Sequence, residues 1–473
     1  LIFSFNTHIM RNIFYSLLAI LLFLPSSCSE DILEKDETGD LSLEAVYSDI
    51  LLADQVLNNL YSRVRSVFRN GINEYAAFSA GAYLDCGTVY GQPQMNWSSA
   101  IVFNAGGWNS SNCWFNSGTN IVDGRIYPVN YNSIRAAWLF LENIDKVPFD
   151  EEYGYGPEQL EQKKGEAYFL LAWYHHELVS FYGGITLVKE LMEPGSEAAT
   201  GPRNTYDECV EYMLELCDMA AERLPVKWPG NELGRVTEGA ALALKSRILL
   251  YSASPLFNNP DKPEDSPFRG TYDPGKWEEA ARAAWDVIAL NQYSLHPDIT
   301  ELFVMETNSE SIFQRMYYPS RSLEHADLPP EVGSNGNKGR NQVTYNLYKN
   351  YKVLRDGMAY DQDDPASGWD LQDPYSNLDP RFYRDCIFNG CWAKAYSPVE
   401  LWESDPDVPK AKSITPNNCS FLILRKFTDP NITAWVGAAY HNKMYIRYAE
   451  ILLNYAEAMN EAFGPEVDGL GNG

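Results

Sequence analysis

The adjacent residues His175, His176 and Glu177 are of the types that bind metal ions. Within a helix, however, neighbouring side chains point about 100° apart and cannot grip one ion together. A metalloprotease helix instead carries its histidines four positions apart. We therefore interpret these three as side chains of a partly buried helix, and we expect no metal or other cofactor.

Three further motifs imitate catalytic or ligand-binding signatures without their context. AFSAG (77–81) resembles a nucleophile elbow, but no strand–turn–helix pattern surrounds it. DQDD (361–364) lacks the spacing of a calcium-binding EF-hand, and GSNGNKG (333–339) lacks that of a phosphate-binding loop. A carboxylate pair for glycoside hydrolysis remains an open alternative, because 64 acidic residues make chance pairs unavoidable.

The most unusual stretch is residues 86–122, which hold no Asp, Glu, Lys or Arg in a chain that is 21% charged. Aromatic planes can cover the weakly apolar faces of sugar rings, and amides can both donate to and accept from hydroxyls. Charged groups would add a desolvation cost without gaining an ionic partner on a neutral polysaccharide. We expect a glycan site formed by Trp97 with Asn96, by Trp108 and Trp114, and more weakly by Tyr83 and Tyr90. The alternative is that these tryptophans form the core of a loop-rich subdomain.

A cysteine, Cys28, lies between an apolar run and an acidic patch. Upstream, residues 10–24 hold a positive charge followed by a short apolar segment, as in a secretory signal peptide. The segment is shorter than the ~20 apolar residues that span a membrane. We expect residues 1–27 to be removed and Cys28 to become a lipidated N-terminus, followed by a tether over residues 28–42. An ordinary signal peptide with an incidental cysteine is the alternative.

The composition excludes several classes of partner. The formal net charge is −27 at pH 7, which disfavours nucleic acid and anionic lipid. The eight cysteines include no CxxC pair, which argues against a metal ribbon and a disulfide-built scaffold. No later stretch approaches the roughly 18 consecutive apolar residues of a membrane span, so we expect a soluble body held only by its lipid.

Apolar residues recur at helical spacing in several segments of the chain. We predict helices at residues 42–65, 132–145, 158–182, 205–224, 235–254, 275–291 and 444–462. The clearest, 158–182, ends at Gly183-Gly184, and glycine is the usual residue at a helix end. Paired amphipathic helices of this kind favour a mostly α fold built on a tetratricopeptide-like helical-repeat frame.

Two long regions, residues 76–128 and 296–440, interrupt the helical pattern. Both are rich in Gly, Pro, Asn, Asp and Tyr, and insertions of such length are usually functional. We therefore predict that they form an irregular, loop-rich binding subdomain. The predicted body spans residues 43–473, with the helical frame at residues 43–75, 129–295 and 441–473.

Several segments resemble, in order, the SusD/RagB family of outer-membrane nutrient-binding lipoproteins. GEAYFLLAWYHHELVSFYGGITLV (165–188) is similar to the signature helix of that family and its Tyr-Gly-Gly exit. The segments that resemble later parts of the family are TYDECVEYMLELCDMAAERLP (205–225), GRVTEGAALALKSRILLYSASP (234–255), YNLYKNYKVLRDGMAY, NLDPRFYRDCIFNG and YIRYAEILLNYAEAMNEA (445–462). The resemblance runs from Cys28 almost to the end of the chain.

The resemblance implies a cell-surface glycan-binding lipoprotein, anchored in the outer membrane through Cys28. Such a protein delivers nutrient to a TonB-dependent outer-membrane transporter without cleaving it. The resemblance also implies four tetratricopeptide-like helix pairs that carry a less regular binding subdomain. It points to regions rather than single residues: the loops of residues 76–128, and residues 300–370, where Tyr317, Tyr318 and Trp369 are candidates.

Two other functions stay open at this point. One is a lipid-anchored glycoside hydrolase, with its two carboxylates somewhere among the acidic residues. The other is a helical-repeat adaptor that binds peptides and has no sugar site.

The last predicted helix, 444–462, has one apolar side. Its residues are Tyr445, Tyr448, Ile451, Leu452, Tyr455 and Met459. In a helix-pair repeat this helix needs an antiparallel partner, yet the sequence ends eleven residues later. We expect that the C-terminus is truncated and that the apolar side is left exposed.

The lipid anchor can be tested by replacing Cys28 with alanine. Loss of the sulfur removes the attachment point of the acyl chains, each buried CH₂ of which contributes ~0.8 kcal/mol to membrane binding. We expect the variant to move from the membrane to the soluble fraction when cells are fractionated. Unchanged membrane association would show that Cys28 carries no anchor.

Overall fold

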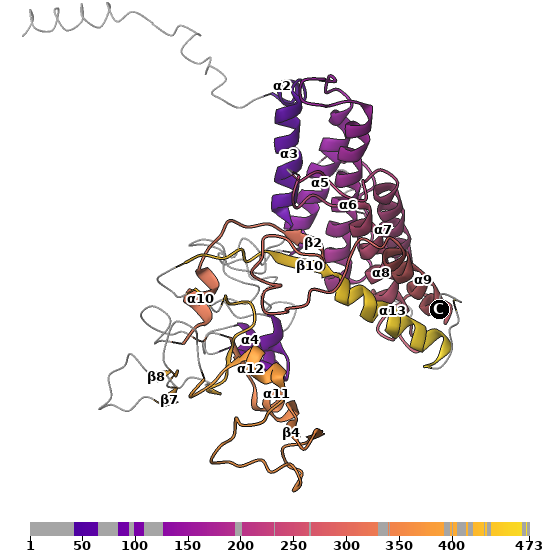
Figure 1. Cartoon of the computed structure of the whole chain (residues 1–473). Coiled ribbons are helices and arrows are strands. Elements are labelled where there is room, and N and C mark those ends of the chain that lie inside the picture. Colours follow the sequence, from indigo (N-terminus) through magenta and orange to yellow (C-terminus); the bar gives the residue numbers. More distant parts are fainter. Residues whose placement is uncertain are drawn as a thin grey trace, which may run out of the picture.

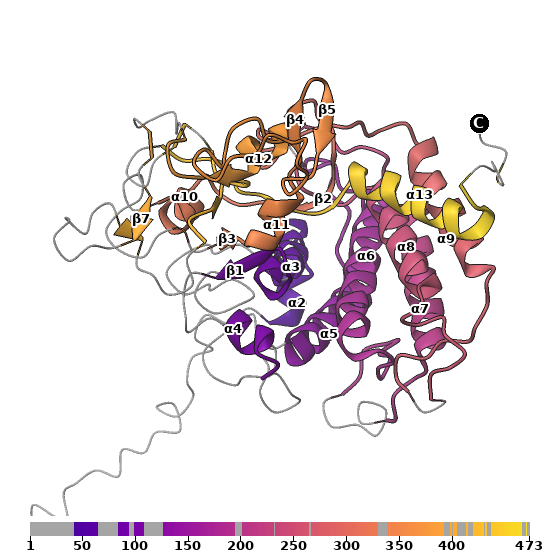
Figure 2. The same ribbon diagram turned by 90° about the horizontal axis from the view of Figure 1, so that it is seen from below.

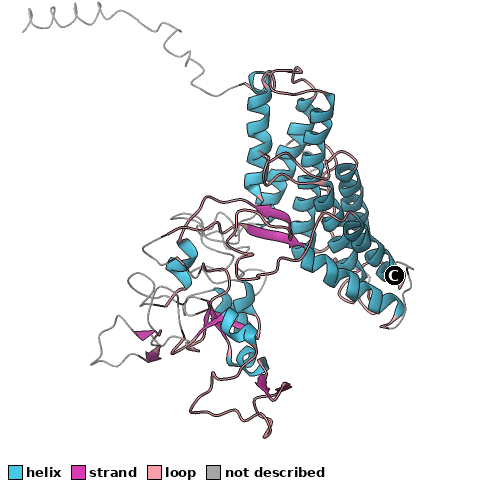
Figure 3. Cartoon of the chain, viewed as in Figure 1, coloured by secondary structure: helices cyan, strands magenta, loops and turns pink. Residues whose placement is uncertain are grey.

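Helices stack on one side of the molecule, and short strands and loops gather on the other (Figures 1 and 3). The computed structural model describes residues 42–64, 84–93, 99–107, 126–193, 201–230, 232–263, 266–329, 339, 341–391, 398–399, 401–403, 413–414, 420–429, 431–432, 437–465 and 470. Helices dominate these residues, so the predicted mostly α fold is confirmed.

The frame is a stack of helices that pack in the order in which they occur in the chain (Figure 1). They are α2 (Leu43–Val46), α3 (Ile50–Arg63), α5 (Ile126–Ile144), α6 (Pro157–Tyr182), α7 (Tyr206–Ala221), α8 (Glu238–Ala253), α9 (Lys276–Ala289) and α13 (Tyr448–Phe463). From α3 to α9 each helix packs on the next, and α13 then packs on α8 and α9. Contacts between neighbours of this kind are typical of helical repeats.

The 26-residue helix α6 has sequence signals at both ends. Pro157 occupies its first turn, where the missing N–H has no helical partner to lose. At the other end Gly183 has a φ of +69°. A Cβ on Gly183 would lie 2.1 Å from the carbonyl oxygen of Pro267, and one on Gly184 would lie 2.2 Å from that of Asn204. Both glycines are therefore needed, because later segments pass directly against them.

Two strands from distant parts of the chain lie beside α6. Strand β2 (Ser311–Arg315) pairs antiparallel with β10 (Lys443–Arg447), with Phe313 opposite Ile446. The ring centroid of Trp173 lies 4.9 Å from that of Phe313 and 5.1 Å from that of Tyr445. Trp173 is only 2% exposed. These aromatic contacts hold the strand pair on the frame.

The borders of the frame differ from the prediction. Residues 444–447, predicted as helix, belong to β10, and α13 begins only at Tyr448. Apolar spacing over so few residues fits either state, and pairing with β2 decides it. Helix α5 begins at Ile126, inside the first region predicted as loops, residues 76–128. Strand β2 lies in the second such region, residues 296–440, but packs on α8.

The loop-rich region is held by a four-stranded sheet in the order β1–β3–β9–β6. Its elements are η2 (Leu84–Gly87), β1 (Gly91–Pro93), α4 (Ser99–Asn104), α10 (Ser322–Asp327), β3 (Asn341–Val343), α11 (Tyr345–Asn350), β4 (Val353–Arg355), β5 (Met358–Tyr360), α12 (Pro380–Asp385), β6 (Cys386–Ile387), β7 (Trp402–Glu403), β8 (Ser413–Ile414) and β9 (Ile423–Leu424). Phe382 is fully buried among the rings of Tyr348, Tyr375 and Phe388. The region thus has a small aromatic core of its own.

Helix α13 packs with its apolar side against the frame. Ile451 and Ala458 are fully buried, and Tyr455 and Met459 are half-buried against α8 and α9. The expectation that this side is exposed is wrong, because α8 and α9 already cover it. Leu453, on another side of the helix, is 68% exposed. The predicted truncation of the chain stays a prediction.

Three observations concern the predicted location in the cell envelope and the cysteines of the chain. Among the described residues, no helix is long and apolar enough to cross a membrane. Cys209, Cys217, Cys386 and Cys391 are buried and have free thiols, and Cys86 is also buried. Cys28 and the predicted signal peptide and tether lie outside the described residues, apart from Ser42, which caps α2.

The buried His175 should make the protein sensitive to acid. Burial lowers the pKa of His175 to about 4, against about 6.5 in an unfolded chain. The unfolded chain therefore takes up a proton on this histidine at a higher pH than the folded protein does. The free energy of unfolding is unaffected by this difference above pH 6.5 and falls by about 3 kcal/mol as the pH is lowered to 4. In urea titrations, the free energy of unfolding of the wild type should fall between pH 7 and pH 4 by about 3 kcal/mol more than that of His175→Leu.

A neighbouring substitution is the control. The ring of Tyr212 lies edge-on to that of His175, with centroids 5.3 Å apart. Tyr212→Phe changes the same packing contact but leaves the imidazole in place, so its pH profile should follow that of the wild type. Parallel profiles for all three proteins would show that His175 does not titrate with unfolding.

Candidate functional site

Strand pairing joins the two regions that were predicted to form the binding site. β1 pairs antiparallel with β3, with Gly91 opposite Val343. Just beyond the strands, the Thr344 N–H donates to the Tyr90 carbonyl at 3.0 Å, and its hydroxyl donates to the Val89 carbonyl at 2.5 Å. Figure 2 shows β1 beside β3 and close to α11. One end of the 76–128 region therefore lies against residues 341–350.

Aromatic and apolar side chains are exposed along this junction. Val89 is 62% exposed, Tyr90 is 50% exposed and Tyr345 is 59% exposed. We call these three residues the seam patch. Half-exposed aromatic rings at the edge of a sheet offer flat faces on which a sugar ring can stack. Tyr90 was predicted as a site residue, whereas Tyr345 was missed; its signal was the aromatic run YNLYKNY directly after β3.

A chain of polar contacts lies next to the seam patch. The side-chain amide of Asn104 donates to the Cys86 carbonyl at 2.8 Å, and the Cys86 thiol contacts Asn341 Oδ1 at 3.5 Å. Asn341 in turn donates from Nδ2 to Asp327 Oδ1 at 2.8 Å. At least one asparagine of the uncharged stretch is therefore structural. Such a satisfied network fixes the backbone that carries Val89 and Tyr90.

Trp369, a predicted site residue, packs against the core of the loop-rich region. Its ring is half-buried in the cluster around Phe382. Its indole N–H lies 3.3 Å from both the Tyr348 hydroxyl and the Pro374 carbonyl. A tryptophan whose N–H is used inside the protein is better explained as support for this core than as a ligand platform.

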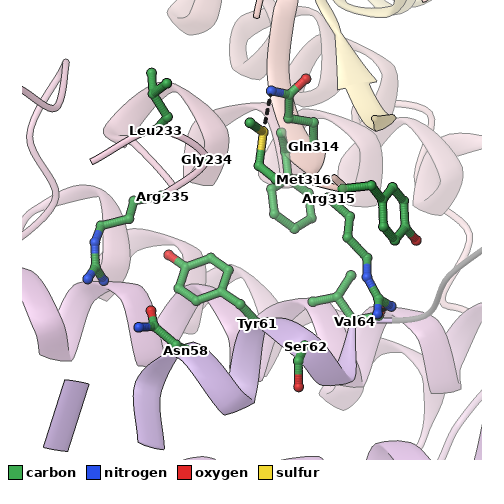
Figure 4. Close-up of a pocket in the computed structure, with 12 residues that line it drawn as sticks. Asn58, Tyr61, Ser62, Val64, Leu233, Gly234, Arg235, Gln314, Arg315 and Met316 are labelled. Atoms are coloured by element: carbon green, nitrogen blue, oxygen red, sulfur yellow. Dashed lines mark hydrogen bonds between the residues drawn. The ribbon is translucent and has the colours of Figure 1, made fainter. Parts of the chain in front are cut away.

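Tyr317, another predicted site residue, lines a pocket of about 310 Å³ where the frame meets the loops (Figure 4). Tyr61 comes from α3, whereas Gln314 and Met316 come from the end of β2 and the residue after it. The Arg315 side chain reaches from this wall to the carbonyl oxygen of Val64. The pocket has the size of a small-molecule site. Tyr318, next along the chain, is 93% exposed.

Paired charges fix the wall of this pocket. The Tyr61 hydroxyl donates to Glu166 Oε2 at 2.6 Å, and Arg235 Nη1 donates to both oxygens of Glu166 at 3.0 and 3.1 Å. Burial raises the pKa of Glu166, although Arg235 and Tyr61 act in the opposite direction. Burial and the Glu166 charge raise the pKa of Tyr61 well above its usual value. We interpret these three residues as structural, because Glu166 already accepts hydrogen bonds from both Tyr61 and Arg235.

The remaining predicted glycan contacts lie outside the described residues. They are Tyr83, Asn96, Trp97, Trp108 and Trp114.

Within the described part of the chain, no group of three or more His, Cys, Asp or Glu side chains could hold a metal ion. His175 is fully buried, and its Nδ1 lies 2.8 Å from the Leu171 carbonyl in the same helix.

Two family models match the chain on either side of its middle. Residues 302–468 match the SusD family model, and residues 88–250 match a model described as starch-binding and associating with the outer membrane. The chain is a member of the SusD/RagB family. The predicted resemblance is therefore confirmed, and the seam patch takes residues from both matched segments.

Similar proteins support this membership and the fold. A SusD-like protein of Formosa agariphila is 22% identical over 343 residues, which are 71% of this chain and 58% of that relative. The chain thus spans little more than half the length of that curated relative. A SusD-like crystal structure from Bacteroides fragilis gives a TM-score of 0.65 at 23% identity, covering 88% of this chain and 76% of the other. The surface glycan-binding protein A of Bacteroides uniformis gives 0.55 at 18%, covering 87% and 76%.

The different environments of Tyr345 and Trp369 lead to opposite expectations. Tyr345→Ala should change the unfolding free energy by less than about 0.5 kcal/mol, because the ring is mostly exposed. Trp369→Ala should cost about 2 kcal/mol or more, since it opens a cavity beside Phe382 and removes the indole N–H donor. Urea denaturation of both variants measures this. The reverse order of stabilities would contradict the placement of these two rings.

Proposed function

We propose that this chain is a cell-surface lipoprotein that captures glycan without cleaving it. The observation that carries the proposal is the seam patch, whose exposed aromatic rings lie where the two segments matched by the SusD/RagB family models join. Stacking on such rings needs no charge and tolerates many sugars. Relatives whose names state glycan or carbohydrate binding support this choice of ligand.

The proposed contacts extend from the seam patch into the uncharged stretch. Trp97 is the first choice, with Asn96 beside it, because it follows β1 by only four residues. Trp108, Trp114 and Tyr83 are further proposed contacts, and Tyr317 and Tyr318 contribute from the strand side. Rigid frames that carry binding residues on loops are common in proteins.

The proposal also includes delivery to a transporter. Family membership suggests that the partner is a TonB-dependent outer-membrane transporter and that the chain is anchored through a lipid on Cys28. The stacked helices α5 to α9 supply a broad surface for such a partner, separate from the aromatic loops. The exposed aromatic rings would then remain accessible to glycan.

Binding without cleavage is tested by incubating the pure protein with a panel of polysaccharides and following both retention and chain length. We expect affinity electrophoresis to show retention of at least one glycan, which is recovered intact. Shortened chains would establish a glycoside hydrolase instead. Failure to retain any glycan would overturn the proposal and favour a peptide-binding adaptor.

Substitution of the proposed platform residues locates the site. Trp97→Ala should weaken binding by about 1–3 kcal/mol, on the scale of stacking between aromatic rings, while the melting temperature stays nearly constant. Trp285→Ala, in α9 of the frame, is the matched control and should bind normally. If alanine variants of Trp97, Trp108 and Trp114 all bind as the wild type, the site assignment is wrong.

A further inference from the structure

A small pocket in the loop-rich region has the opposite charge to the protein as a whole. It encloses about 70 Å³ and is lined by Thr300, Arg384, Asp385, Arg425, Lys426 and Thr428, among others. Three positive side chains thus meet one negative one, in a chain with 64 acidic and 37 basic residues. A local excess of positive charge in so acidic a protein calls for a physical reason.

Asp385 pairs with Arg384 and not with Arg425. Arg384 Nε and Nη2 donate to Asp385 Oδ1 and Oδ2 at 2.7 and 2.8 Å, a bidentate pair. Arg425 Nη1 donates to the Tyr383 carbonyl at 3.2 Å, and among the described residues Arg425 has no carboxylate partner. A guanidinium has five N–H donors in a planar fork that matches oxyanions. Arg425 therefore has donors to spare at the pocket.

Two half-buried arginines of the frame differ from Arg425 in having carboxylate partners. Arg235 pairs with Glu166 at 3.0 Å, and Arg247 pairs with Glu450 at 2.6 Å. Leaving Arg425 half-buried beside Arg384 and Lys426 costs electrostatic free energy, which an anion in the pocket would recover.

The backbone at the pocket is also strained. Phe427 has a φ of +76°, a conformation that bulky residues rarely adopt and that concentrates at functional sites. Its ring lies edge-on to that of Phe303, with centroids 4.7 Å apart, and packs in the same cluster as Tyr317. This cluster connects the cationic pocket with a residue of the proposed glycan site.

We propose that this pocket binds one compact oxyanion, a sulfate or carboxylate group, carried by an acidic glycan. Its volume suits such a group and not a whole sugar ring. Arg425 supplies the main donors, Lys426 adds charge, and the Thr428 hydroxyl lies close by, donating to the Arg425 carbonyl at 2.6 Å. The choice of glycan rests on the proposed function, whereas binding of the anion itself does not.

The first experiment measures inorganic sulfate and acetate separately by titration calorimetry at low ionic strength. We expect one of them to bind the wild type, and Arg425→Gln to weaken that binding at least about tenfold, the effect of losing a charge-assisted hydrogen bond. Arg381→Gln is the matched control: this side chain is 64% exposed, pairs with Asp379 and lies outside the pocket lining. An equal loss in both variants, or no binding to the wild type, overturns the proposal.

The second experiment compares the sulfated, carboxylated and underivatised forms of one polysaccharide. The wild type should bind one acidic form at least about tenfold more tightly than the neutral form, and Arg425→Gln should remove that preference only. If Arg425→Gln does not fold, as judged by circular dichroism, Lys426→Gln takes its place. Binding of the neutral form without any acidic preference overturns the pocket alone. Arg425-dependent anion binding without retention of any polysaccharide overturns the glycan proposal alone.

Discussion

The aromatic contact between α6 and the β2–β10 pair holds the loop-rich region on the helical frame. The chain leaves the frame at the end of β2 and returns only at β10, so one clamp fixes both ends of the intervening loop-rich region. Trp173 and Phe169 bury the Phe313 ring, each with its centroid 4.9 Å away. Arg247 secures the same corner, because it pairs with Glu450 and donates to the Tyr445 carbonyl. The frame thereby sets where the loops present their surface.

Electrostatics divides the molecule in a similar way. In the frame, the partly buried Arg235 and Arg247 have carboxylate partners, which offset part of the cost of burying them. At the seam patch the described side chains are uncharged and interact through aromatic and apolar surface. The pocket beside α12 brings three positive side chains together with one negative one. A net charge of −27 repels anions at long range, so selection of an acidic group has to occur at short range, in contact.

The structure also clarifies how an irregular region can be well placed. Its sheet is small, and β3 and β9 share one residue pair, Gln342 opposite Ile423. The cluster around Phe382 supplies the apolar burial that these short strands lack. Aromatic residues in the loop-rich region therefore serve two purposes: some, such as Trp369, hold the loops, and others, such as Tyr345, remain exposed. A sugar platform needs both kinds, because an exposed ring binds well only when its backbone is fixed.

The order of the helices, their approximate ends and the family could be predicted from the sequence, because helix periodicity and the Gly183-Gly184 exit are local properties of the chain. It also pointed to Tyr90 and Tyr317 from their residue type and region. The strand at residues 443–447 and the pairing of β1 with β3 could not be predicted, since pairing of distant segments leaves no local signal. The same holds for exposure: Trp369 and Tyr345 are both aromatic, and only packing makes one a support and leaves the other free to meet a ligand.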